Sequence, residues 1–315
     1  MVLYHTEEYI MKTIKTVNII GLGALGMLYG QNITEALGFE NTCFVMDKAR
    51  YQKNKDNQYT CNGEPVSFHI IPDTEATPVD LVIVAVKYPG LQKAMDTMTS
   101  SVGPNTIILS VMNGISSETI LAERFGNQNM IYTVGQGMDS GKFGNELRYT
   151  KAGELHIGII DSGSQENLDA VASLLSQVNL DYVIEDDILY RIWGKYMLNV
   201  GCNQTCMVYS ANYGDLYEKE ECFITFVSAM REVIAVANAE GIPLSESDLN
   251  MYVDIIKTLD KKLCPSMAQD RINKKPCEVD MFSGALMELA KKHDIHVPVN
   301  TYLNHRAKEI EAEYL

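Results

Sequence analysis

The stretch VNIIGLGALG, residues 17–26, decides the fold of the first half of this chain. An apolar run, Val17–Ile20, leads into a G-x-G-x-x-G motif, and a helical pattern follows from Ala24 to Leu37. In this context the first glycine permits a tight turn, the second lets the backbone approach a pyrophosphate, and the third allows close helix–strand packing. The N–H groups that open the helix then attract the phosphates. The motif predicts a dinucleotide site formed by Gly21, Leu22, Gly23, Ala24, Leu25 and Gly26. A glycine turn that serves packing alone is the alternative.

The residues after the next predicted strand, Thr42–Met46, bear on which dinucleotide is bound. Asp47 lies about 20 residues beyond the motif, where an acidic side chain meets a ribose hydroxyl. A carboxylate there repels a 2′-phosphate and favours NAD(H). Lys48 and Arg50 follow at once and are suited to holding that phosphate, unless they are solvated surface charges. The sequence leaves both cofactors open.

The remaining pattern divides the chain into an α/β part and a helical part. Leu81–Val86 and Thr106–Val111 are further apolar strands separated by helical segments, which predicts a doubly wound parallel sheet. Residues 131–160 are predicted to add an antiparallel extension to that sheet. We expect a Rossmann-type dinucleotide-binding domain over residues 1–185, with an N-terminal extension over residues 1–15, and an all-α domain over residues 186–315. The predicted helices of the second part span Ile188–Asn203, Cys222–Glu240, Leu249–Leu259 and Glu278–His293.

Composition excludes several classes of protein. At ~150 residues per domain, 315 residues predict two domains, and 46% apolar with 21% charged residues is an ordinary globular composition. A net charge of −15 argues against binding nucleic acid or an anionic membrane. Met1–Lys12 lacks the apolar segment of a secretory signal. Seven scattered cysteines without a Cys-x-x-Cys pair are typical of reduced thiols, so we expect a cytoplasmic protein.

Three short patterns in the second part are candidates for chemistry. Lys195, Asn199 and Asn203 recur every four residues and therefore share one helix face. The alternative to a functional role is a solvent-facing lysine with two incidental amides. Ser266 and Gln269 are spaced as a capping box. Glu278 follows a proline at the start of a predicted helix, where an acid compensates the helix dipole. No set of histidines, cysteines or carboxylates has metal-ligand spacing, so no metal is expected.

Taken in order, these motifs resemble the 2-dehydropantoate 2-reductase, or ketopantoate reductase, family. The resemblance covers roughly residues 17–298. It implies a Rossmann-type domain, a helical domain and reduction of 2-dehydropantoate to (R)-pantoate by NADPH, on the way to pantothenate and coenzyme A. The residues that carry it are Gly21–Gly26, Val86-Lys87, Met112-Asn113-Gly114, Trp193-Gly194-Lys195, Asn199, Asn203, Pro265-Ser266-Met267, Asp270, Glu278, Asp280 and Gly284.

The resemblance also implies a role for each matching residue. Lys195 is the general acid and Glu278 a catalytic or substrate-binding carboxylate. Asn113, Asn199, Asn203 and Ser266 contact the substrate, and Lys87 and Asn113 lie at the cofactor.

One position differs from the family pattern and leaves alternative hypotheses about the cofactor. Many members have an arginine where this chain has Asp47, so NADP(H) is expected with NAD(H) as the alternative. Because related NAD-dependent D-2-hydroxyacid dehydrogenases keep an equivalent lysine, another small 2-keto acid is an alternative substrate. A third hypothesis is a non-catalytic dinucleotide sensor. Because a sensor needs only the glycine motif, the presence of Lys195, Ser266 and Glu278 argues against it. A homodimer is left open.

Overall fold

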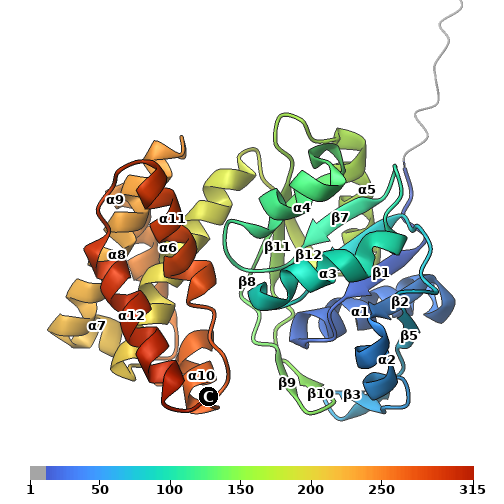
Figure 1. Ribbon diagram of the computed structural model, residues 1–315, viewed down its shortest axis with the longest axis horizontal. Coiled ribbons are helices and arrows are strands. Elements are labelled where there is room, and N and C mark those ends of the chain that lie inside the picture. Colours follow the sequence, from blue (N-terminus) through green and yellow to red (C-terminus); the bar gives the residue numbers. More distant parts are fainter. Residues whose placement is uncertain (1–11) are drawn as a thin grey trace, which may run out of the picture. The chain divides into compact units, whose positions relative to one another are not determined.

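The computed structural model describes residues 12–315, which form two compact units (Figure 1). The first comprises the residues up to Met112 together with Glu118–Ile188, and the second comprises Asn113–Ser117 and Leu189–Leu315. The expectations of no secretory signal and of an N-terminal extension fall mainly on residues 1–11, outside the described residues. Residues 12–15 pack onto the first unit: Ile14 is buried, and the backbone N–H of Lys15 donates to Asp80.

An eight-stranded sheet forms the centre of the first unit, in the order β12-β11-β8-β7-β6-β1-β2-β5. All neighbours from β5 to β8 pair in parallel, β8 and β11 pair antiparallel, and β11 and β12 pair in parallel. Because β1 lies between β2 and β6, the strand order reverses beside β1, where open α/β sheets bind ligands. The strands are β1 Val17–Ile20, β2 Thr42–Met46, β5 His69–Pro72, β6 Leu81–Val84, β7 Ile107–Ser110, β8 Met130–Gln136, β11 Glu154–Gly158 and β12 Asp181–Ile184. The helices are α1 Ala24–Leu37, α2 Lys48–Asn54, α3 Leu91–Met98, α4 Ser117–Phe125 and α5 Gln165–Gln177.

The antiparallel extension predicted over residues 131–160 is only partly right. Within it, β8 continues the parallel sheet and β11 is its antiparallel neighbour, but the hairpin between them belongs to a second sheet. That sheet has the order β4-β3-β10-β9 and packs against α1 (Figure 1). Its strands are β3 Tyr59–Cys61, β4 Glu64–Val66, β9 Gly141–Phe143 and β10 Glu146–Arg148. Three-residue strands carry too little alternation to be distinguished from turns in the sequence.

The second unit is helical, which confirms the predicted combination of an α/β domain and an all-α domain. Its helices are α6 Ile188–Tyr209, α7 Asp215–Glu218, α8 Glu220–Ala239, α9 Glu246–Thr258, α10 Ser266–Ile272, α11 Ala285–Lys292 and α12 Pro298–Ala312. A π-helical segment, Asp280–Gly284, precedes α11. Helix α6 continues six residues beyond the predicted end at Asn203, because Cys206 and Met207 remain buried in the unit's core.

Helix α8 is long and apolar enough, by length and composition, to cross a membrane. Core helices of soluble proteins meet the same criterion. In this unit α8 packs against α7, α9, α11 and α12, and it buries side chains along its length, among them Phe226, Met230 and Val233. We therefore interpret α8 as the central helix of the second unit.

Candidate functional site

The glycine turn joins β1 to α1 at the carboxyl edge of the sheet. Gly21 has a φ of +116°, in the left-handed region that favours glycine, and a Cβ there would lie 2.7 Å from the carbonyl carbon of Ala85. A Cβ on Gly26 would overlap the carbonyl oxygen of Gly21. The first and third glycines are therefore required by the packing of the turn itself.

Packing of the turn does not explain the second glycine, Gly23. Gly23 has an ordinary extended conformation, with φ −86° and ψ −170°. Among the described residues, apart from its neighbours in the chain, the one atom within 4 Å of a Cβ built there is the carbonyl oxygen of Ala85, at 3.8 Å, an ordinary contact. Since no described protein atom excludes a side chain, the open space at Gly23 fits a ligand that approaches the backbone. Gly23 is the N-cap of α1, and the first turn of that helix carries no acidic residue to repel an anion.

A lysine from a distant strand reaches this turn. Lys142 of β9 donates from Nζ to the carbonyl oxygen of Leu22 at 2.6 Å, and its ammonium lies 5.9 Å from the centre of the Tyr59 ring. Burial lowers the pKa of Lys142. The sequence gives no signal for this contact, because Lys142 lies 120 positions from Leu22 and belongs to no motif.

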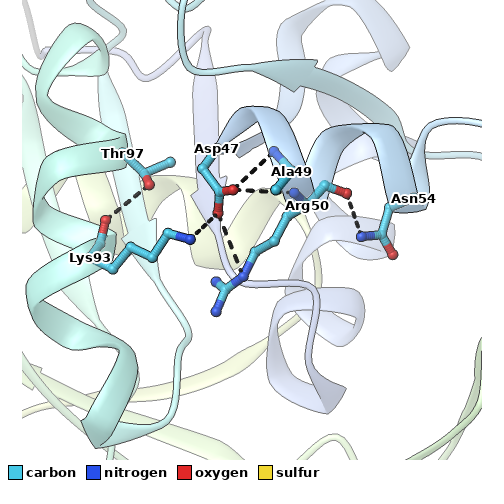
Figure 2. A network of polar contacts seen from close by, with 6 residues as sticks. All are labelled: Asp47, Ala49, Arg50, Asn54, Lys93 and Thr97. Atoms are coloured by element: carbon cyan, nitrogen blue, oxygen red, sulfur yellow. Dashed lines mark hydrogen bonds and ion pairs between the residues drawn. The ribbon is translucent and has the colours of Figure 1, made fainter.

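Asp47 lies directly after β2, as predicted, at the N-cap of α2 (Figure 2). Its Oδ1 accepts hydrogen bonds from the backbone N–H groups of Ala49 at 3.1 Å and Arg50 at 3.2 Å. Its Oδ2 pairs with Lys93 Nζ of α3 at 3.0 Å and with Arg50 Nε at 3.6 Å. Although partial burial acts to raise it, the hydrogen bonds from Lys93 and the α2 backbone hold the pKa of Asp47 below its usual range.

The other two predicted cofactor lysines lie at the surface. Lys48 is the first residue of α2 and is exposed, and Lys87 is exposed just beyond the carboxyl end of β6. Both positions are at the edge of the sheet that carries the glycine turn. The pairing of Lys93 with Asp47 was not anticipated, because Lys93 lies on a separate helix without a motif around it.

In the second unit, Lys195 projects from α6 toward Asn113. Lys195 Nζ donates to Asn113 Oδ1 at 2.9 Å, which joins two predicted site residues 82 positions apart. The loop of Asn113 packs closely here: Gly114 has φ +95°, and a Cβ there would lie 2.8 Å from Met281 Cγ. The lysine is thus anchored by a loop that precedes it in the chain.

The charge of Lys195 depends on three neighbouring influences. Burial lowers its pKa to about 8, the nearby Glu278 carboxylate opposes that change, and the charge of Arg191 adds to it. Glu278 lies just before the π-helical segment, and its carbonyl oxygen accepts from the N–H groups of Met281 and Phe282. The structure therefore brings Lys195, Asn113 and Glu278 together from three separate segments of the second unit.

Farther along α6, Asn199 and Asn203 continue the same face, and a hydrogen bond of 3.3 Å joins them. Asn203 is buried, and its Oδ1 accepts from Ser266 Oγ at 3.1 Å and from the backbone N–H of Met267 at 3.3 Å. The face therefore leads from Lys195 to the start of α10.

The capping box predicted for Ser266 and Gln269 is wrong. Pro265 is the N-cap, Ser266 is the first residue of α10, and no side chain of the helix caps it. Gln269 instead donates to the carbonyl oxygen of Cys264. Because Asn203 reaches across from α6 to bind the Met267 N–H, a residue outside the helix does the capping. That leaves the exposed Ser266 hydroxyl at the end of the α6 face.

Sequence models of one family match both parts of the chain. "Ketopantoate reductase PanE/ApbA" matches residues 17–162, and "Ketopantoate reductase PanE/ApbA C terminal" matches residues 187–311. A 2-dehydropantoate 2-reductase of Streptococcus pyogenes serotype M3 is 27% identical over 289 residues, which are 90% of this chain and 93% of the relative.

Two solved structures illustrate the likeness in fold. A D-mandelate dehydrogenase with NADH and anilino(oxo)acetate superposes with a TM-score of 0.83 at 23% identity, over 95% of this chain and 99% of the other. A dimeric ketopantoate reductase from Staphylococcus aureus has a TM-score of 0.77 at 19% identity, over 95% of this chain and 100% of the other. At these identities the likeness establishes the fold alone.

Proposed function

The chain belongs to the ketopantoate reductase family, and we propose that it is an oxidoreductase that reduces 2-dehydropantoate to (R)-pantoate with NADPH, in the formation of pantothenate and coenzyme A. The observation that carries the proposal is the partly buried ammonium of Lys195, which Asn113 holds and which the charge of Glu278 influences. Relatives named 2-dehydropantoate 2-reductase support the substrate.

Reduction of a ketone needs a proton as well as a hydride. A nicotinamide dinucleotide supplies the hydride when bound. Lys195 donates the proton from Nζ to the oxygen that gains negative charge, and its positive charge stabilises that oxygen before the proton moves. Asn113 fixes the direction of the ammonium, and Glu278 favours its charged form against the effect of burial.

The pKa of Lys195 predicts how the rate depends on pH. With a pKa of about 8, the amine is protonated and able to donate at neutral pH and loses its proton as the pH rises. We expect kcat/KM for keto-acid reduction to be level below pH 8 and to fall about tenfold per pH unit above it. Oxidation of the hydroxy acid needs the neutral amine, so its kcat/KM rises toward pH 8. Initial rates in both directions measure this, and a reduction profile still level at pH 10 would contradict it.

The first unit fits a dinucleotide at the glycine turn. The backbone at Gly21–Gly26 and the N-terminus of α1 would hold the pyrophosphate, and the open space at Gly23 accommodates its approach. Lys142 would add a positive charge next to the turn, and Lys87 lies at the same edge of the sheet. In the second unit, Asn199, Asn203 and Ser266 would bind the keto acid.

Ser266 is predicted to bind the substrate carboxylate, with its O–H turned from Asn203 Oδ1 toward the substrate. Ser266→Ala removes one charge-assisted hydrogen bond, worth ~1.5–3 kcal/mol, so KM for the keto acid rises by roughly 10- to 150-fold. Stability changes little, because Asn203 still binds the Met267 N–H. Steady-state kinetics and thermal denaturation of the same preparation measure both quantities. A lower melting temperature with unchanged KM would assign the serine a structural role only.

One assay tests the proposal as a whole. NADPH and NADH oxidation are measured with 2-dehydropantoate and with a panel of 2-keto acids that includes aromatic and branched members. The highest kcat/KM is expected for 2-dehydropantoate with NADPH. No turnover with any keto acid, combined with tight dinucleotide binding, would favour a sensor.

A second candidate function is NAD-linked reduction of another 2-keto acid, as in a D-2-hydroxyacid dehydrogenase. The D-mandelate dehydrogenase with NADH favours it, as does the acidic Asp47 at the end of β2. In that case NADH is preferred, and a different keto acid is reduced fastest.

We further propose that the enzyme is cytoplasmic, because all seven cysteines are free thiols. We also propose that it forms a homodimer, by analogy with the dimeric ketopantoate reductase from Staphylococcus aureus.

A further inference from the structure

Both oxygens of the Asp47 carboxylate face groups of the protein. Its Oδ1 accepts the backbone N–H groups of Ala49 and Arg50, and its Oδ2 is buried and forms ion pairs with Lys93 and Arg50 (Figure 2). Its side chain is only 16% exposed. To accept the two hydroxyls of a ribose, Asp47 would have to release Lys93 or uncap α2.

The two cations beside Asp47, Arg50 and Lys93, are more exposed than Asp47 and have donors that do not face it. The side chains of Arg50 and Lys93 are 53% and 56% exposed, and each carries several N–H donors of which only one faces Asp47. They come from two different helices, α2 and α3, and converge at the carboxyl end of β2. That end of the second strand is where a dinucleotide-binding sheet distinguishes a ribose 2′-hydroxyl from a 2′-phosphate.

We propose that Arg50 and Lys93 form the binding site for the 2′-phosphate of NADPH, and that Asp47 positions these two cations instead of accepting the ribose hydroxyls. The inference rests on the proposed function, because it assumes that the glycine turn binds a dinucleotide. Lys93 is then a specificity-determining residue. Asp47, whose acidic type favours NAD(H) when the sequence is considered alone, becomes part of an NADPH site.

The charge balance supports this assignment. One carboxylate between two cations leaves the Asp47–Arg50–Lys93 cluster with a net positive charge. A phosphate monoester carries about −1.5 to −2 charges at pH 7 and three strong acceptor oxygens, which match a guanidinium and an ammonium on adjacent helices. Lys48 is also exposed nearby, but no described contact directs it toward Asp47, so the proposal gives it no role.

The test measures affinity rather than activity, on the full chain. Isothermal titration gives Kd for NADPH, NADH, adenosine 2′,5′-bisphosphate and AMP, with the wild type and with Lys93→Ala, Arg50→Ala and Lys48→Ala. Lys53→Ala, another exposed lysine on α2, is the matched control. For Lys93→Ala and Arg50→Ala we expect about tenfold weaker binding of NADPH and the bisphosphate, reduced by solvent exposure from the full value of a charge-assisted bond. NADH and AMP change by less than about threefold.

Two results would overturn the inference and leave the proposed function intact. One is NADPH binding that tolerates Lys93→Ala and Arg50→Ala but weakens in Lys48→Ala. The other comes from Asp47→Asn, which can still cap α2. If Asp47 binds ribose, this change weakens NADH at least about tenfold and spares NADPH, whereas the proposal expects NADH within about threefold. If the wild type binds neither dinucleotide, the proposed function itself fails.

Discussion

Lys195→Ala is expected to lose about 10²- to 10⁴-fold in kcat while keeping its affinity for NADP(H). That range is typical of a positioned acid or base, and here one side chain supplies both the proton and the positive charge. Because negative charge on the substrate oxygen develops only as hydride arrives, the loss falls on kcat more than on ground-state binding. Dinucleotide affinity is preserved because the glycine turn lies in the other unit of the chain.

Single-turnover kinetics with saturating NADPH measure the loss, and titration of NADPH fluorescence measures the affinity. Lys257→Ala is the control, since Lys257 is an exposed lysine of the same unit that pairs only with Asp254 among the described residues. Near-normal turnover of Lys195→Ala would mean that another group donates the proton. The assignment of the active site to α6 would then be wrong.

Alanine substitutions at two glycines of the same turn are expected to have different effects on stability. Gly26→Ala forces a methyl group onto the carbonyl oxygen of Gly21, a backbone atom that cannot move without opening the turn. Overpacking costs about 1–3 kcal/mol, and we expect a loss of unfolding free energy near the upper end together with loss of dinucleotide binding. Gly23→Ala meets only Ala85 at 3.8 Å, so its stability stays within about 0.5 kcal/mol of the wild type.

Gly23→Ala nevertheless weakens dinucleotide binding by at least about tenfold, or ~1.4 kcal/mol, because its methyl group occupies the space proposed for the pyrophosphate. Urea denaturation and dinucleotide titration of the two variants measure these effects. Equal destabilisation of both variants would show that Gly23 serves packing. Unchanged affinity in Gly23→Ala would place the dinucleotide away from the turn.

The elements with strong local signals could be predicted from the sequence. Helix α1 and strand β2 have the predicted bounds, because each is set by neighbours in the chain: a glycine turn before α1, Gly38 after it, and an unbroken apolar run in β2. The short strands β3, β4, β9 and β10 gave no such signal. They form two local hairpins, β3–β4 and β9–β10, and the pairing of β3 with β10 joins segments 86 residues apart.

The sequence by itself determined the order of the motifs, and with it the family, the α/β and helical division and the candidate residues on α6. Tertiary structure decided what those residues touch. Only folding sets Asn203 against the start of α10 in place of a capping box, and brings Asn113 to Lys195. Only folding places Lys93 and Lys142 beside the cofactor motifs. Spacing along a helix or strand fixes which face a side chain occupies, whereas its hydrogen bonds, burial and pKa depend on groups from distant segments, which no local pattern records.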